Sequence, residues 1–122
     1  MSDKGLLLAI VEQGGYPDFT ALYERLGYKV EVIRAMRKAI QYLKKNTPQV
    51  IVAEFNFQSD FRDRTSSLES LIAVLQRQTD TRLVVFYDQE YAHQLQRLQG
   101  QHRLHATLPF PIDTAKLEAV LR

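Results

Sequence analysis

Short apolar runs of strand length alternate along the chain with longer segments in which apolar residues recur every three or four positions. Residues 6–11 and 50–55 are apolar almost throughout, which is typical of strands covered by helices on both faces. Residues 29–33 alternate between polar and apolar side chains, like a more exposed strand. Two further strands are predicted at residues 83–87 and around 105–108. Five strands separated by helical segments indicate βα units around a parallel sheet.

The segments between these strands have helical spacing. Residues 17–26 carry apolar side chains at i, i+3, i+4 and i+7, with Pro17 in the first turn, and Gly27 offers a left-handed C-terminal cap. The same spacing returns from Arg34 and stops before Pro48. Asp88 can cap the helix after the fourth strand. The pattern therefore predicts a helix after each strand.

Length and composition place few further constraints. A chain of 122 residues with 45% hydrophobic and 25% charged residues fits one globular domain spanning residues 1–122. The absence of cysteine excludes disulfides, thiol catalysis and thiolate metal sites, and suits the reducing cytoplasm. The apolar run at 6–11 is too short for a signal peptide or a membrane span. We therefore expect a cytoplasmic protein without a membrane segment.

Charge says little about partners. Sixteen basic against fourteen acidic residues give a net charge of +2. The densest basic stretch is the predicted helix at 34–45, which carries Arg34, Arg37 and Lys38. Such a run is usually a solvated helix face, and DNA-binding domains generally carry a larger excess of positive charge. Binding of nucleic acid or an acidic partner through this helix is therefore a secondary hypothesis.

Candidate site residues follow from the predicted topology. In open parallel sheets, ligands bind at the carboxyl ends of the strands, near the point where the strand order reverses. The residues at these ends are Glu12, Gln13, Glu54, Tyr87, Asp88, Leu108 and Pro109.

The order of these segments resembles the receiver domain of two-component response regulators. The local matches are Leu-Ala-Ile-Val-Glu at 8–12, Leu-Gly-Tyr-Lys-Val at 26–30, Pro-Gln-Val-Ile-Val-Ala-Glu at 48–54 and Leu-Pro-Phe at 108–110. The resemblance covers nearly the whole chain. It implies a flavodoxin-like (βα)5 doubly wound sandwich with a five-stranded parallel sheet of order 2-1-3-4-5.

Active receivers hold Mg²⁺ with two adjacent acids after strand one and an aspartate ending strand three, which accepts the phosphoryl group. A hydroxyl after strand four and a lysine after strand five contact that group. A carboxylate can attack a phosphoryl donor only where cations offset the charge gathering on the phosphoryl oxygens.

By this resemblance the apparatus is incomplete. Glu12 matches the first acid, but Gln13 stands in place of the second. Glu54 replaces the aspartate and is one methylene longer, and Tyr87 replaces the small hydroxyl residue. Leu108 takes the place of the lysine. We therefore predict that the chain is not an enzyme, and that it has no phosphotransfer, metal or other cofactor.

Alternatives remain open for individual residues. Glu54 is either a polar strand end facing solvent, a carboxylate that imitates a phosphorylated state, or part of a residual Mg²⁺ site with Glu12 and the carbonyl of Asn56. Tyr87 is expected to cover the vacated pocket. By resemblance, the peptide bond before Pro109 is expected to be cis.

Possible contact residues lie elsewhere. His105 precedes Leu108 by three residues, which matches the place where receivers often carry an aromatic residue that reports activation. Phe57 and Phe61, with Phe55, crowd one long polar loop, and such rings either pack on the core or are covered by a partner.

The leading hypothesis is a non-phosphorylatable pseudo-receiver that acts in signalling as a protein-interaction module. One mode is a homodimer through the face of helix four, strand five and helix five. The alternatives are a small flavodoxin-like nucleotide- or flavin-binding protein, or a nucleic-acid-associated regulator using the helix at 34–45. Against nucleotide binding, residues 12–15 have neither a Walker spacing nor a GxGxxG fingerprint.

Overall fold

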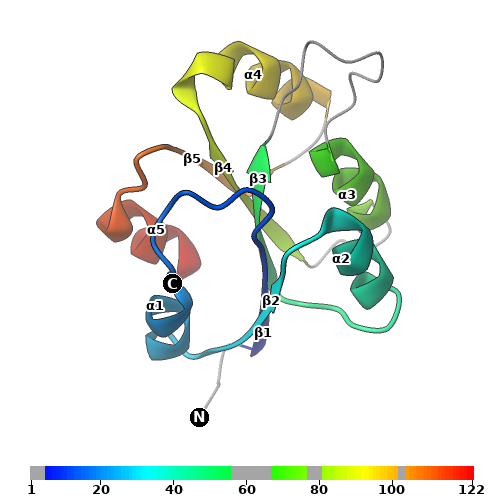
Figure 1. The fold of residues 1–122 in the computed structure, drawn as a ribbon, viewed down its shortest axis with the longest axis vertical. Helices are drawn as coiled ribbons and strands as arrows, with labels where there is room; N and C mark the ends of the chain where they lie inside the picture. Colours follow the sequence, from blue (N-terminus) through cyan, green and yellow to red (C-terminus); the bar gives the residue numbers. More distant parts are fainter. Residues whose placement is uncertain (1–4, 56–66, 77–80, 102–103) are drawn as a thin grey trace.

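Five parallel strands form one sheet in the computed structural model, which describes residues 5–55, 67–76, 81–101 and 104–122 (Figure 1). The strand order is β2-β1-β3-β4-β5, and every neighbouring pair is parallel. This confirms the predicted fold class and the predicted strand order. The strands are β1 (Gly5–Ile10), β2 (Tyr28–Ile33), β3 (Val50–Phe55), β4 (Arg82–Tyr87) and β5 (Ala106–Pro109).

Helices cover both faces of the sheet, so both faces are apolar. Two of the helices pack on one face and three on the other (Figure 1). None of the helices within the described ranges is long and apolar enough to cross a membrane. The first face carries α1 (Thr20–Arg25) and α5 (Thr114–Leu121), and the second carries α2 (Met36–Leu43), α3 (Ser67–Leu75) and α4 (Ala92–Gln101), which the short 3-10 helix η1 (Gln89–Tyr91) precedes.

The helix ends follow local sequence signals. Asp88 accepts a hydrogen bond from the backbone N–H of Glu90 and caps η1, as predicted. Gly27 has a φ of 104°, which confirms the left-handed turn after α1. The prediction was wrong at the start of α1, which begins three residues after Pro17. Its N-cap is Phe19, and the carboxylate of Asp18 just before it accepts from the backbone N–H of Thr20 at 2.9 Å.

Alternation along β3 decides where its polar end lies. All six residues of β3 are buried, as expected for a central strand. Val50 and Val52 pack with α1 and α5, whereas Ile51, Ala53 and Phe55 pack with α2, α3 and α4. Because side chains alternate along a strand, Glu54 belongs to the α1 and α5 face.

Candidate functional site

Glu54 ends up inside the protein. Its side chain is 1% exposed, and no other charged side chain that the structure describes is buried. The hypothesis that it is a solvent-facing strand end was therefore wrong. Burying a carboxylate destabilises the folded protein unless hydrogen bonds replace those that the group made with water. The effect of burying Glu54 therefore depends on its neighbours.

Those neighbours come from the loop between β1 and α1. The backbone N–H groups of Glu12 and Gln13 donate to the two Glu54 carboxylate oxygens, each at 3.0 Å, and that of Gly14 donates at 3.3 Å. Gly14 has a φ of 71°, a conformation that side chains rarely adopt and glycine adopts freely. The glycine thus lets the loop curl its amides around an anion.

Tyr16 supplies the fourth donor. Its hydroxyl donates to Glu54 Oε2 at 2.8 Å. The ring of Tyr16 contacts Phe86 of β4 edge to face at 5.1 Å between centroids and stacks on Phe110 after β5 at 5.7 Å. We call Glu54, its three loop amides and these three rings the Glu54 seal. The seal joins the ends of β1, β3, β4 and β5 through one carboxylate and one aromatic cluster.

The carboxylate also changes the acidity of Tyr16. Burial raises the pKa of the Tyr16 phenol above its ordinary value of 10.0, and the hydrogen bond to Glu54 and the charge of Glu54 raise it further. The phenol therefore remains protonated, and a donor, at every pH near neutrality. Tyr16 is suited to hold the carboxylate and not to act as a base.

No protein-family model and no curated protein matches this chain. Solved structures do match it. A response regulator receiver domain protein from Clostridium thermocellum superposes with a TM-score of 0.74 at 11% identity, covering 96% of this chain and 90% of its own. A receiver protein from Burkholderia phymatum gives 0.72 at 10% identity, with 97% and 95% covered. The N-terminal signal receiver domain of a Bacteroides fragilis response regulator gives 0.71 at 20%, with 96% and 93% covered.

The chain has the fold of a response-regulator receiver domain. Sequence identities of 20% or less relate these proteins by fold. The receiver fold nevertheless gives each strand end a defined place, so the residues predicted from the sequence can be compared with the positions they occupy.

Leu108, which was expected to stand in place of the lysine after the fifth strand, does not follow β5. Leu108 lies within β5, 6% exposed, beside Phe86 of β4 in the buried row that also contains Glu54. The residue that follows β5 is Phe110, whose N–H donates to the carbonyl of Tyr87 at 2.9 Å. The cis peptide bond joins Phe110 to Pro111 and does not precede Pro109, so that prediction was also wrong. The first side chain after β5 is therefore an uncharged phenyl ring.

Tyr87 packs, as predicted, but on the other face of the sheet. It joins the core formed with α2, α3 and α4, while Glu54 faces α1 and α5. It therefore does not cover the Glu54 carboxylate. Tyr16 does so instead, from the β1–α1 loop.

A magnesium site does not fit this arrangement. Four N–H and O–H groups point at the Glu54 carboxylate, which has about four lone-pair sites. Gln13 is exposed and adds no charge. Across the described ranges, no three His, Cys, Asp or Glu side chains gather as a possible metal site. Asn56, whose carbonyl was a candidate ligand, lies outside the described residues.

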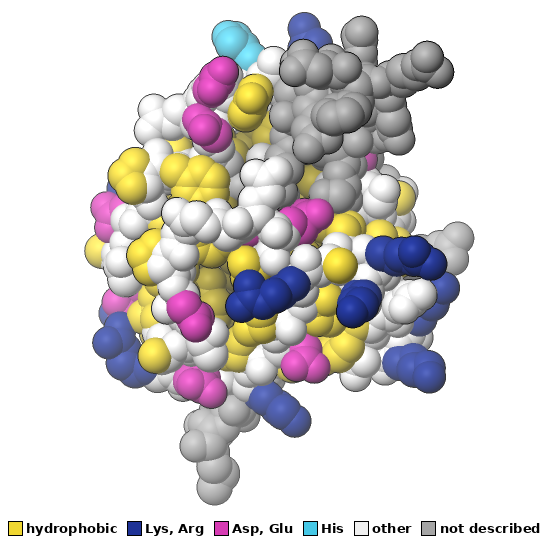
Figure 2. Space-filling model, in the orientation of Figure 1, with side chains coloured by type: hydrophobic (Ala, Val, Ile, Leu, Met, Phe, Trp, Pro, Cys, Tyr) yellow, Lys and Arg dark blue, Asp and Glu magenta, His cyan; other side chains and the backbone are white. Residues whose placement is uncertain are grey.

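The predicted contact residues are scattered. His105 is exposed before β5, and its Nε2 lies 3.4 Å from the carbonyl oxygen of Val120 in α5. Arg34, Arg37 and Lys38 are exposed at and near the start of α2, and Figure 2 shows lysine and arginine side chains on the side of the molecule where α2 lies. Phe57 and Phe61 lie outside the described residues.

Sequence reasoning missed Tyr16 and Phe110. Tyr16 follows two glycines and belongs to no helical or strand pattern, so nothing local distinguishes it from a solvent-exposed loop residue. Phe110 stands between two prolines, and either X-Pro bond could be cis. The aromatic cluster is formed by residues that are distant in sequence, which a local pattern cannot reveal.

Proposed function

We propose that this protein is a receiver-fold module that regulates another protein through direct contact and is not switched by phosphorylation. The Glu54 seal carries the proposal. A phosphoacceptor must present a free carboxylate oxygen to a phosphoryl donor, with cations nearby to offset the developing charge. Here the carboxylate is buried, it accepts hydrogen bonds from four donors among the described residues, and aromatic rings lie beside it.

The position after β5 supports the same proposal. In phosphotransfer, a fixed ammonium is worth several orders of magnitude in rate because it stabilises the transferring group. Phe110 has no charge, and its ring stacks on Tyr16. Filling this space with aromatic carbon preserves the shape of the sheet edge while excluding an anion.

The direct test is exposure to a phosphoryl donor. Purified protein is incubated with acetyl phosphate and Mg²⁺, or with beryllofluoride and Mg²⁺, beside a phosphorylatable receiver as positive control. We expect no mass increase by mass spectrometry and no shift in melting temperature. A stoichiometric phosphoryl adduct on the wild type that is absent from Glu54→Gln would contradict the proposal.

The regulatory contact has its own test. We place it on the face formed by α4, β5 and α5, which includes His105 and Lys116. Proteins crosslinked to the chain in its native cell are identified, purified and titrated against two variants that each reverse one exposed lysine, Lys116→Glu on α5 and Lys38→Glu on α2. We expect Lys116→Glu to weaken binding about tenfold, or about 1.4 kcal/mol, and Lys38→Glu to leave it unchanged. Equal affinity of both variants for every partner would argue against this face.

The same face could join two copies of the chain. Sedimentation of the wild type and of Lys116→Glu distinguishes this mode from a contact with a different protein. A dimer that the substitution dissociates would identify the partner as a second copy.

A further inference from the structure

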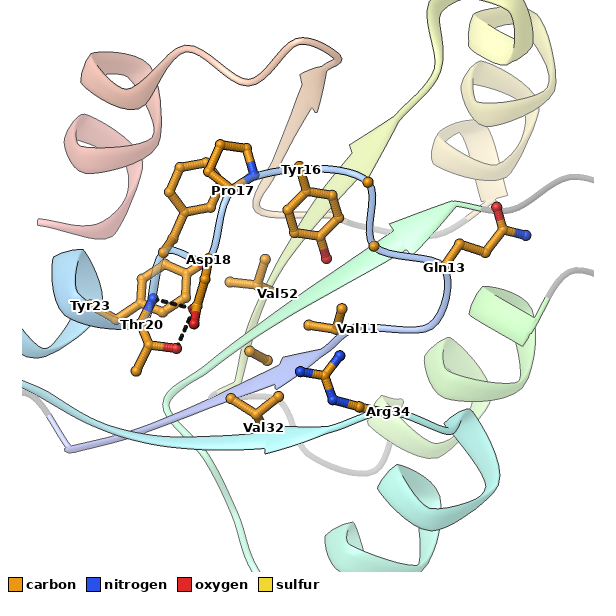
Figure 3. Close-up of a pocket in the computed structure, with 14 residues that line it drawn as sticks. Val11, Gln13, Tyr16, Pro17, Asp18, Thr20, Tyr23, Val32, Arg34 and Val52 are labelled. Carbon is orange, nitrogen blue, oxygen red and sulfur yellow. Dashed lines mark hydrogen bonds between the residues drawn. The ribbon is translucent and has the colours of Figure 1, made fainter.

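A cavity of about 470 Å³ lies beside the Glu54 seal, on the α1 and α5 face of the sheet (Figure 3). It opens between α1, the end of β1 and the end of β2. Its volume lies within the range of about 300–1,000 Å³ that is usual for small-molecule sites. Glu54 is not among its lining residues, so the cavity is separate from the carboxylate described above.

The cavity lining combines apolar and polar side chains. Ala9 of β1 and Val52 of β3 form part of the lining and are 5% and 2% exposed, and the ring of Tyr23 adds a wall from α1. At the rim, Val32 of β2 is 38% exposed. No other large hydrophobic side chain in the described part of the chain is exposed. The apolar part of this lining, together with the exposed valine, forms a surface that gains stability when it is covered.

Two charged side chains flank this apolar lining, and they are not equivalent. Asp18 is already engaged, because its Oδ1 accepts from the N–H of Thr20 at 2.9 Å and from the Thr20 hydroxyl at 2.6 Å. Arg34, just after β2, is exposed and makes no hydrogen bond or ion pair with any residue in the described ranges. The cavity thus has one cation with all its donors available.

We propose that this cavity binds a small molecule with an apolar body and a single carboxylate group. The body would lie against Ala9, Val32 and Val52, and the carboxylate would pair with Arg34. A guanidinium matches a carboxylate with two parallel N–H donors, which gives the ligand one orientation.

The charge pattern favours a monocarboxylate over a phosphate ester. A phosphate monoester carries a charge between −1.5 and −2 near neutral pH and is usually met by several cations or amides. Only one cation lines the described cavity, and Asp18 lines the same cavity. Hydrogen bonds from Thr20 are the main cause that lowers the pKa of the Asp18 carboxyl group, and the charge of Arg34 has a smaller effect in the same direction. A second negative charge on the ligand would be repelled by Asp18.

A ligand in the cavity would contact residues that belong to the Glu54 seal. Gln13, Gly14 and Tyr16 line the cavity, and the same three residues hold Glu54. A ligand would therefore touch the loop that joins β1, β3, β4 and β5. This inference goes beyond the regulatory role proposed above and does not depend on it.

The test is an NMR titration of the whole chain labelled with ¹⁵N. The probes are hydrocinnamate and octanoate, and the neutral amides of both acids serve as matched ligands. We expect saturable shifts at the backbone amides of Gly14, Gly15 and Val32, with at least one acid binding about two- to fivefold more tightly than its amide, as for an exposed ion pair. Absence of saturable shifts at these amides with both acids overturns the proposal.

Two arginine variants assign the charge contact. Arg34→Gln removes the guanidinium at the cavity, and Arg37→Gln removes another exposed guanidinium, on α2, that does not line it. We expect Arg34→Gln to abolish the preference for acid over amide and Arg37→Gln to retain it. Both variants change exposed residues, and their melting temperatures verify the fold. A preference that survives Arg34→Gln, or that both variants lose equally, overturns the pairing.

Discussion

At the scale of single residues, one extra methylene gives the end of β3 a different role. Glu54 continues the row of Val50 and Val52, and its longer side chain brings a carboxylate to the amides of the β1–α1 loop. The negative charge is therefore used inside the molecule, where it organises a loop. The same charge would otherwise destabilise the fold, since ionised groups are rarely buried without partners.

We expect Glu54→Gln to lower the free energy of unfolding by about 2–3 kcal/mol, because the new amide turns donors toward the loop N–H groups and leaves buried donors unpaired. The matched control is Glu90→Gln, an exposed glutamate beside Asp88, which should stay within about 0.5 kcal/mol of the wild type. Urea unfolding followed by circular dichroism measures both. Equal stability of the two variants would show that the seal contributes nothing.

Tyr16→Phe should lower the free energy of unfolding by about 1.5–3 kcal/mol near neutral pH, because the lost hydrogen bond is to a charged group. The pH dependence of the free energy of unfolding shows whether the protonated phenol is responsible. The pKa of Tyr16 is raised in the folded protein, so its contribution is fully present below the unfolded value of 10.0 and is lost as the pH rises above it.

The wild type should therefore lose stability above about pH 10 more steeply than Tyr16→Phe does. Tyr23 keeps part of the slope in both proteins, because burial also raises its pKa, with a smaller effect from the charge of Asp18. Urea unfolding at a series of pH values between about 8 and 11 measures the difference. Identical slopes would mean that the pKa of Tyr16 is not raised in the folded protein.

At the scale of elements, the turn between α1 and β2 depends on one glycine. Gly27 has a φ of 104°, and its N–H donates to the carbonyl of Glu24 at 3.0 Å. Tyr28 begins β2 directly after this turn. The turn therefore fixes where the edge strand of the sheet starts.

Replacing Gly27 with alanine should cost about 1–3 kcal/mol, because a side chain is strained at this φ. Gly100 supplies the opposite case, since it lies within α4 in a helical conformation and an added methyl group would meet nothing within 4 Å. Gly100→Ala should raise the melting temperature, with a gain of about 0.5–1 kcal/mol. Thermal unfolding measures the change in melting temperature of both variants. A change in the same direction for both would refute this account.

The elements were largely predictable and the site was not, for a physical reason. Strands such as β3 can be recognised from the local hydrophobic pattern, because burial on both faces requires a continuous apolar run. The end of β5 is set instead by pairing of Phe110 with Tyr87 on the neighbouring strand. The partners of Glu54 lie about forty residues earlier in the chain, and no periodicity reports such a contact.

At the scale of the whole molecule, one buried hydroxyl ties the edge of the sheet to the last helix. Tyr28, at the start of β2, is 1% exposed and donates to the carbonyl of Leu121 in α5 at 2.6 Å. Arg82 at the start of β4 donates to the same hydroxyl at 3.1 Å. This junction lies at the amino ends of the strands, opposite the Glu54 seal.

Tyr28→Phe should lower the free energy of unfolding by about 1–2 kcal/mol, since it removes the hydroxyl that serves Leu121 and Arg82. Tyr42→Phe is the control, because the hydroxyl of Tyr42 has no hydrogen bond within the described residues. Chemical unfolding compares the two. The cavity should be unaffected, so the titration with hydrocinnamate serves as a check that Tyr28→Phe retains the fold.

Under the role proposed above, the Glu54 seal also limits how this chain could be engineered into a phosphorylation switch. Shortening Glu54 to aspartate would withdraw the carboxylate from its loop amides, and exchanging Phe110 for lysine would insert an ammonium into a ring stack. Each single replacement lowers stability before any new chemistry is gained. Directed evolution that accumulates one change at a time would have to pass through less stable variants. Simultaneous redesign of the loop and both positions offers the more direct route.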